Sequence, residues 1–217
     1  MLLADQRCAV VTACRDLLAA GLVRGTSGNV SVRVPATGTI AITPTGMRYP
    51  GMRAEDVAVL APDGSQLDGA LRPTSELALH LAVYAERPDV GAVVHTHSMF
   101  ATTFAVLGEP VPPVHYLIAR TGGSVPVAPY ARYGTVELAQ AAVRALGTGF
   151  AVLLANHGVV AVGTDLDHAM AVAEAVETTA ELAWRARQAG VAQLLDADEL
   201  AAAAEAFAGY GRPVDRD

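Results

Sequence analysis

The chain contains no lysine, because all fifteen of its basic Lys/Arg residues are arginines. Without lysine there is no side-chain amine to form a Schiff base with a carbonyl substrate or with pyridoxal phosphate. There is also no P-loop lysine to bind the phosphates of a nucleotide. Carbonyl chemistry in this protein would therefore need another electron sink, and a metal ion is the obvious candidate.

Cysteines and long apolar runs are also scarce. The two cysteines, Cys8 and Cys14, lie six residues apart in one predicted helix, which is neither a disulfide framework nor a zinc-ribbon pattern. No apolar run approaches the ~18 residues of a membrane span, and the N-terminal residues lack the charged-then-apolar layout of a signal peptide. The sequence predicts a soluble, cytoplasmic protein in a reducing compartment, without a membrane partner.

Positive charge is in deficit. Fifteen basic and 22 acidic residues give a net charge of −7, which disfavours nucleic acid as the main partner because phosphate backbones attract basic surfaces. A small anionic substrate is not excluded, since it responds to local donors. The hydrophobic content of 52% indicates a folded globule rather than a disordered chain.

Helical and alternating apolar patterns follow one another along the chain. Helices are predicted at residues 3–20, 73–87, 98–107, 134–146, 165–189 and 198–208, and strands at residues 30–34, 39–43, 57–61, 90–95, 150–155 and 159–163. Residues 108–133 are rich in Pro, Gly and Tyr and are predicted to form strand pieces and loops. With no internal repeat and no long linker, residues 1–217 are predicted to form a single α/β domain. Its sheet is expected to be mixed or antiparallel, because the first two strands form a hairpin.

Three of the six histidines are candidate metal ligands. His95 and His97 end a predicted strand, so both imidazoles project to one face. His157 lies in a tight Asn-His-Gly turn, and Glu76 lies at the start of a helix. Together they make a zinc-type set, although each buried histidine alone is more often a core residue and spacing alone does not join them. The other histidines are assigned to packing (His80) or to structural and surface positions (His115, His168).

Three polar segments form a second group. They are Gly28-Asn29, Thr45-Gly46 and Thr74-Ser75, all in predicted loops or at a helix start. Their backbone N–H groups and hydroxyls suit a phosphate in the absence of lysine. Ordinary turn and capping chemistry is the alternative interpretation.

Taken together, these residues resemble the class II aldolase family, of the L-fuculose-1-phosphate aldolase type. The resemblance runs from the first helix to residue 211, and its matching segments are Gly25-Thr26-Ser27-Gly28-Asn29-Val30-Ser31-Val32-Arg33, Ile42-Thr43-Pro44-Thr45-Gly46, Ser75-Glu76, Val93-Val94-His95-Thr96-His97, His115-Tyr116, Ala128-Pro129-Tyr130-Ala131 and His157-Gly158. The resemblance implies a single α/β domain with a central, largely antiparallel sheet between helical layers. It also implies a homotetramer with active sites at subunit interfaces.

The resemblance also implies roles for individual residues. His95, His97 and His157 would bind one zinc ion per subunit, and Glu76 would ligate the same ion and then act as the base. The residues implied in phosphate binding are Gly28, Asn29, Thr45, Gly46, Thr74 and Ser75. Tyr116 would donate a proton at a neighbouring subunit's site, and Tyr210 would lie near the aldehyde.

The implied reaction is zinc-dependent, reversible cleavage of a ketose 1-phosphate, with L-fuculose 1-phosphate giving dihydroxyacetone phosphate and L-lactaldehyde. Tyr133 stands where an apolar aromatic residue is expected, which leaves the aldehyde preference open. Two alternatives use the same scaffold: a methylthioribulose-1-phosphate dehydratase and a pentulose-phosphate 4-epimerase, although epimerases usually carry Asp where Glu76 stands. A non-catalytic interaction module like the adducin head is disfavoured, because that domain lacks the zinc ligands present here.

Overall fold

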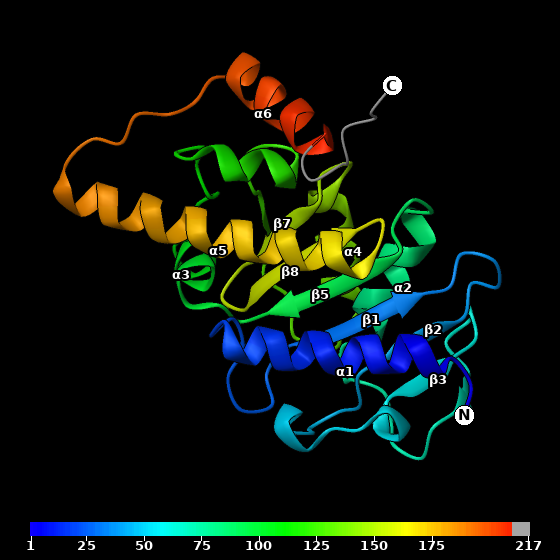
Figure 1. The fold of residues 1–217 in the computed structure, drawn as a ribbon. Helices are drawn as coiled ribbons and strands as arrows, with labels where there is room; N and C mark the ends of the chain where they lie inside the picture. The colour runs from blue at the N-terminus through cyan, green and yellow to red at the C-terminus, as the bar shows by residue number, and fades with distance from the viewer. Residues whose placement is uncertain (210–217) are drawn as a thin grey trace, which may run out of the picture.

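A mixed eight-stranded sheet runs through the middle of the computed structural model, which describes residues 1–209 (Figure 1). The strand order is β4-β3-β2-β1-β5-β8-β7-β6, and every neighbouring pair is antiparallel except β6 and β7. This confirms the predicted single α/β fold with a largely antiparallel sheet. The strands are β1 (Asn29–Arg33), β2 (Ile40–Ile42), β3 (Ala58–Leu60), β4 (Gln66–Asp68), β5 (Ala92–Thr96), β6 (Val127–Ala128), β7 (Ala151–Leu154) and β8 (Gly158–Gly163).

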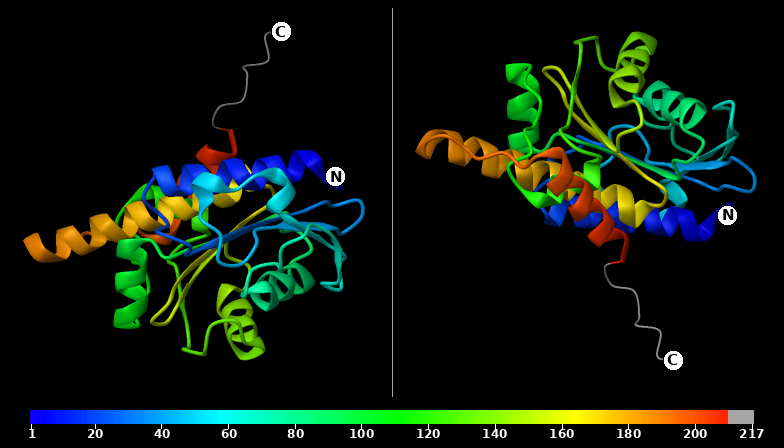
Figure 2. Two further views of the ribbon diagram at one scale, coloured as in Figure 1. Left: turned by 90° about the horizontal axis from the view of Figure 1, so that it is seen from below. Right: turned by 90° about the horizontal axis from the view of Figure 1, so that it is seen from above.

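Helices cover both faces of this sheet. The views in Figure 2 show α1 and α5 on one face and α2 and α4 on the other. The helices are α1 (Ala4–Ala19), α2 (Leu77–Glu86), α3 (Met99–Leu107), α4 (Val136–Leu146), α5 (Leu166–Ala189) and α6 (Ala197–Gly209), with short 3₁₀ turns η1 (Tyr49–Gly51), η2 (Ala54–Asp56) and η3 (Tyr116–Thr121). None of the helices within residues 1–209 combines the length and apolar character that a membrane span needs.

The central strands are apolar on both faces because each face carries its own core. In β8, Val159 and Ala161 belong to the core shared with α1, α3 and α5, whereas Val160 and Val162 belong to the core shared with α2 and α4. Successive side chains of a strand point to opposite faces, so a strand buried on both sides appears in the sequence as a continuous apolar run.

One end of the sheet gathers the ends of three segments. β5 lies between β1 and β8, with His95 opposite Asn29 on one side and opposite Val160 on the other. Because β5 is antiparallel to both neighbours, its last residues lie beside the first residues of β1 and β8. Polar residues at these three positions are therefore brought together by the register of the sheet.

Two parts of the fold differ from the sequence prediction. Residues 66–68 form β4, which was not predicted, and residues 116–121 form the 3₁₀ helix η3 within a segment predicted as strand pieces and loops. The predicted hairpin of the first two strands is confirmed by the pairing of β1 with β2.

Candidate metal centre and adjoining pocket

Two of the predicted metal ligands, His95 and His97, stand at the C-terminal end of β5. Ladder hydrogen bonds to β1 and β8 fix the backbone at His95 from both sides. Side chains two residues apart on an extended chain project to the same face, and the two Nε2 atoms lie 2.9 Å apart. The spacing His-Thr-His thus brings two ring nitrogens to one point.

The third histidine, His157, enters from the tight turn between β7 and β8. Asn156, directly before it, has a φ of 56°, in the left-handed region that asparagine occupies more readily than most residues. The ring centroid of His157 lies 4.9 Å from those of both His95 and His97. The structure therefore brings together three histidines that lie on two separate segments of the sequence.

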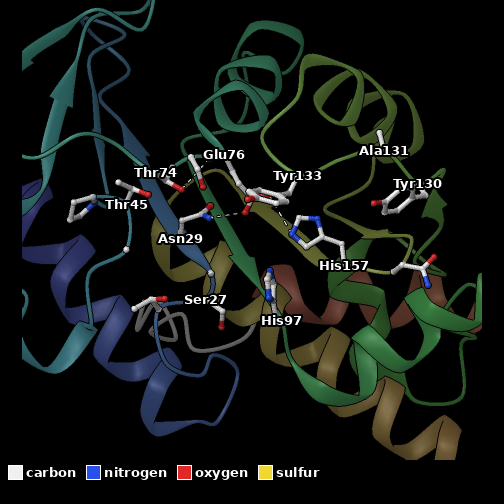
Figure 3. A pocket seen from close by; sticks show the side chains of 16 residues that line it. Ser27, Asn29, Thr45, Thr74, Glu76, His97, Tyr130, Ala131, Tyr133 and His157 are labelled. Atoms are coloured by element: carbon white, nitrogen blue, oxygen red, sulfur yellow. Dashed lines mark hydrogen bonds and ion pairs between the residues drawn. The ribbon is translucent and has the colours of Figure 1, made fainter.

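The carboxylate of Glu76 completes the group. Glu76 is the residue directly before α2, and its Oε2 lies 3.0 Å from His95 Nε2 while its Oε1 lies 3.4 Å from His157 Nε2. One ligand atom from each of the four residues lies within 4.8 Å of all the others. Figure 3 shows Glu76, His97 and His157 side by side at the edge of a pocket.

Hydrogen bonding indicates that this group fits a cation. His95 Nδ1 lies 2.9 Å from the carbonyl oxygen of Val159, which can only accept, so Nδ1 carries the hydrogen. Nε2 of His95 is then the ring nitrogen that faces Oε2 of Glu76, and an N–H to a backbone carbonyl on the other side of the ring is the usual arrangement of a metal-binding histidine. Oε1 of Glu76 is also buried without a hydrogen-bond partner among the described residues. The donor set of three imidazoles and one carboxylate matches a divalent ion, with zinc the typical choice.

The protonation states are those that metal binding needs. Burial, reinforced by the neighbouring imidazoles of His95 and His157, lowers the pKa of His97 to about 3. Burial and the charge of His95 lower the pKa of His157 to about 4, so both rings are neutral near pH 7. Burial alone would raise the pKa of Glu76, but attraction to His95 and His157 and hydrogen bonds from His95 and Asn29 hold it well below its usual range. Neutral imidazoles and an ionised carboxylate can bind a metal without first losing protons.

Gly158 leaves room for the imidazoles. A Cβ at this position would lie 2.4 Å from the carbonyl oxygen of Thr96, 2.9 Å from Cδ2 of His97 and 3.3 Å from Cε1 of His95. Its φ is outside the left-handed region, so glycine is required here by space rather than by backbone conformation.

Replacing Gly158 by alanine is expected to displace β5 or the two rings beside it. Overpacking of this kind costs about 1–3 kcal/mol of the free energy of unfolding, and shifted ligands should weaken divalent metal binding about 10- to 100-fold. Urea denaturation and a zinc titration measure the two effects. Gly51→Ala is the matched control, because a Cβ there meets nothing within 4 Å. Wild-type stability and zinc affinity in Gly158→Ala would contradict this account of the site.

A pocket of about 360 Å³ opens beside the four ligands (Figure 3). Glu76, His97 and His157 contribute to its wall. The same wall contains all six residues predicted for phosphate binding: Gly28, Asn29, Thr45, Gly46, Thr74 and Ser75. The structure therefore brings both predicted groups of residues to one cavity, of a size that holds a small ligand.

Backbone contacts hold the loops of this pocket together. The N–H of Thr45 donates to the carbonyl of Arg72, and the N–H of Thr74 donates to the carbonyl of Thr43, at 3.0 and 2.9 Å. Gly28 has a φ of +80°, and a Cβ there would lie 2.7 Å from the carbonyl oxygen of His95, so only glycine fits. Among the described residues, those lining the pocket include no arginine, so the donors available to an anion are hydroxyls, the amides of Asn29 and Asn156, and backbone N–H groups.

Among the described residues, one residue predicted for catalysis, Tyr116, does not line this pocket. Tyr116 lies in η3, where the residue is 52% exposed and its ring stacks on that of Phe207 at a centroid distance of 5.8 Å. Tyr210 lies outside the described residues. Tyr130 and Tyr133 do line the pocket. Tyr130 was not predicted as a site residue, although the segment Ala-Pro-Tyr-Ala that contains it was part of the family resemblance.

His80 is more than the packing residue that the sequence indicated. It is fully buried, as expected of a core residue, but both of its ring nitrogens are hydrogen-bonded. Nε2 contacts Oδ1 of Asn29 at 2.5 Å and Nδ1 contacts Oγ of Ser31 at 2.6 Å. No local pattern in the sequence signals these contacts, because both partners lie about fifty residues away.

Comparison with known proteins shows similarity over nearly the whole chain. A model of the class II aldolase and adducin N-terminal domain matches residues 8–184. The 5-deoxy-D-ribulose 1-phosphate aldolase of Bacillus thuringiensis serovar kurstaki is 41% identical over 212 residues, which cover 98% of this chain and 100% of that protein. A 5-methylthioribulose-1-phosphate/5-deoxyribulose-1-phosphate aldolase of Rhodospirillum rubrum is 41% identical over 203 residues, covering 93% of this chain and 90% of that protein.

A solved structure supports the same relationship at the level of the fold. The structure of an L-fuculose 1-phosphate aldolase is 37% identical in sequence to this chain and superposes with a TM-score of 0.92. The superposition covers 96% of this chain and 98% of that one.

Proposed function

Since the chain belongs to the class II aldolase and adducin N-terminal domain family and carries a buried site of three histidines and one glutamate, we propose that it cleaves a 5-deoxypentulose 1-phosphate. The products would be dihydroxyacetone phosphate and acetaldehyde. The observation that carries this proposal is the position of the four ligands in the wall of a pocket lined by neutral anion donors. Two relatives that are 41% identical are named for 5-deoxyribulose 1-phosphate, which supports this choice of ketose.

A second candidate substrate is L-fuculose 1-phosphate, which would give L-lactaldehyde. The solved L-fuculose 1-phosphate aldolase supports it, with its TM-score of 0.92. The phenol groups of Tyr130 and Tyr133 line the pocket and can hydrogen-bond the extra hydroxyl of a hydroxyaldehyde. The two substrates differ at the aldehyde end only, so both use the same metal and phosphate groups.

His95, His97, His157 and Glu76 would hold the metal ion, and we propose zinc, one per subunit. When bound, it supplies a Lewis acid that polarises the substrate carbonyl. A lysine-free chain has no iminium alternative for this purpose.

The chain's own residues would carry the remaining steps. Cleavage breaks the C3–C4 bond after the C4 hydroxyl loses its proton, and the electron pair of that bond moves toward the C2 carbonyl. The proton released from the C4 hydroxyl would pass to solvent, and Glu76 would take up one proton in its place and deliver it to C3; in the synthetic direction Glu76 would remove the C3 proton. Asn29, Thr45 and Thr74, with the nearby backbone N–H groups, would hold the phosphate and fix the register of the substrate.

Tyr116 would complete the site from a second subunit. In this chain it does not line the pocket and is half exposed, which agrees with a role at a neighbouring subunit's site in a homotetramer. There its phenol would exchange the proton of the C4 hydroxyl oxygen.

A panel of ketose phosphates tests the proposed function. We expect 5-deoxyribulose 1-phosphate to yield dihydroxyacetone phosphate with a kcat/KM at least about tenfold above that for L-fuculose 1-phosphate, because one pocket contact of this kind discriminates by about 1–3 kcal/mol. A coupled assay for dihydroxyacetone phosphate, with and without a chelator, measures this. A reversed preference would select L-fuculose 1-phosphate. No dihydroxyacetone phosphate from either ketose would defeat the aldolase proposal and favour the dehydratase or epimerase.

A further inference from the structure

A continuous row of buried polar side chains runs from the interior of the protein to Glu76. It begins at Tyr84, whose hydroxyl lies 2.8 Å from Oγ of Ser31, and continues from Ser31 Oγ to Nδ1 of His80 at 2.6 Å. His80 Nε2 then meets Oδ1 of Asn29 at 2.5 Å, and Nδ2 of Asn29 donates to Oε2 of Glu76 at 3.0 Å. All five side chains are buried.

The chemistry of the groups fixes the direction of every bond in this row. Nδ2 of Asn29 donates to Oε2 of Glu76, so the same amide presents its carbonyl Oδ1 to Nε2 of His80. An amide carbonyl can only accept, so Nε2 of His80 carries a hydrogen. Burial lowers the pKa of His80 to about 3, so the ring is neutral and its Nδ1 is an acceptor. Ser31 must therefore donate to His80, and Tyr84 must donate to Ser31.

This direction determines what Asn29 offers to the pocket. With Oδ1 held by His80, the amide presents only N–H groups on its other side. One hydrogen of Nδ2 is used by Glu76, and the second remains for the pocket that Asn29 lines. If the amide were reversed, its carbonyl oxygen would face both the carboxylate of Glu76 and any bound anion, and both contacts would be repulsive.

We propose that His80 is a positioning residue, which holds the amide of Asn29 in the orientation that donates both to Glu76 and to a bound phosphate group. This rests on the proposed function insofar as Glu76 is the base and the anion is a sugar phosphate. The two ring nitrogens of His80 contact Ser31 and Asn29, so His80 makes no hydrogen bond to a metal ligand. It also does not line the pocket. Removing the Nε2 donor should therefore affect Glu76 and the binding of phosphate only through the orientation of the Asn29 amide.

The hydrogen on His80 is directly measurable. In full-length protein labelled with ¹⁵N-histidine, we expect long-range ¹H–¹⁵N spectra to show His80 as the neutral Nε2–H form. The His80 signals are assigned by their disappearance in His80→Gln. An Nδ1–H form of His80 would overturn the proposal, whatever the enzyme's substrate.

Two substitutions separate positioning from simple packing. Glutamine places its NH₂ group near the position of Nε2 and retains a donor to Asn29, whereas asparagine reaches only to the position of Nδ1 and retains only the contact with Ser31. We expect His80→Asn to lower kcat/KM about 10- to 100-fold, the usual range for residues that orient metal ligands, and to weaken binding of inorganic phosphate. We expect His80→Gln to stay within about threefold of wild type on both measures.

The measurements distinguish a positioning role of His80 from a packing role. Urea denaturation of the two variants checks that their stabilities are similar, as a common packing loss predicts. Equal losses in kcat/KM and in phosphate binding for His80→Asn and His80→Gln would show a merely structural role and overturn the proposal. If the wild-type protein cleaves no ketose 1-phosphate, the proposed function fails. The tautomer of His80 and the contrast between the variants in binding inorganic phosphate would still decide the positioning role.

Discussion

Replacing Glu76 by glutamine is expected to leave a folded protein that still binds inorganic phosphate but turns over about 10²- to 10⁴-fold more slowly, the usual contribution of a positioned acid–base group. Glutamine has the same shape, and its side-chain oxygen still accepts the hydrogen bond from Nδ2 of Asn29. It lacks the negative charge and the basicity needed to exchange the C3 proton. Measuring kcat on the preferred ketose 1-phosphate, together with phosphate affinity, separates these effects.

Glu177→Gln is the matched control for this experiment. Its carboxylate accepts hydrogen bonds from the backbone N–H groups of Phe100 and Ala101 at 2.8 Å each, at the start of α3. Losing the charge there should cost about 1–2 kcal/mol of the free energy of unfolding and leave kcat within about threefold. Near-normal turnover in Glu76→Gln, with the stability loss confined to Glu177→Gln, would refute Glu76 as the base.

The parts of the fold that the sequence predicted are those with a strong local signal. β5 and β8 are apolar on both faces, and α4 has an apolar face between a Thr cap and a Gly end. The residues of each element therefore predict it without information from the rest of the chain. β4 was missed because it is only three residues long, lies at the edge of the sheet and is mostly exposed. Its strand conformation comes from pairing with β3 rather than from an apolar pattern of its own.

The candidate site divides in a similar way. The pair His95 and His97 is a local pattern, whereas the meeting of that pair with His157 and Glu76 depends on the register of β1, β5 and β8. Spacing alone did not supply that register, and the four residues were grouped only through the family resemblance. The hydrogen bonds of His80 were not predicted, because a histidine among apolar neighbours on a helix is ordinarily a packing residue.

The space requirement at Gly158 was hidden for a related reason. In the sequence, Asn-His-Gly is typical of a tight turn, and a glycine in a turn suggests a need for backbone freedom. In the structure it is Asn156 that has the positive φ, while Gly158 is paired in β8 and faces the rings of two histidines. The need for glycine at this position comes from the close approach of β5, which leaves no room for a side chain.

Replacing His97 by glutamine is expected to weaken zinc binding about 10²- to 10³-fold. Zinc sites with four protein ligands bind with about 10–16 kcal/mol, so one ligand in four accounts for roughly 2.5–4 kcal/mol, or two to three powers of ten in Kd. His97 is less buried than His95, so its replacement threatens folding less. Metal analysis after dialysis and a competition titration with a chelator of known affinity measure the change.

The same substitution should uncouple stability from zinc. An ion that binds only the folded protein stabilises it by about 4 kcal/mol when present at 1,000 times its Kd, so the wild-type Tm should rise with zinc and fall with chelator. A Kd raised 10²- to 10³-fold removes most of that rise, whereas the control His168→Gln, on α5 away from the four ligands, should retain it. Stoichiometric zinc and an undiminished rise in Tm in His97→Gln would show that the four side chains gather for another reason. The assignment of the metal centre would then fail together with the chemistry built on it.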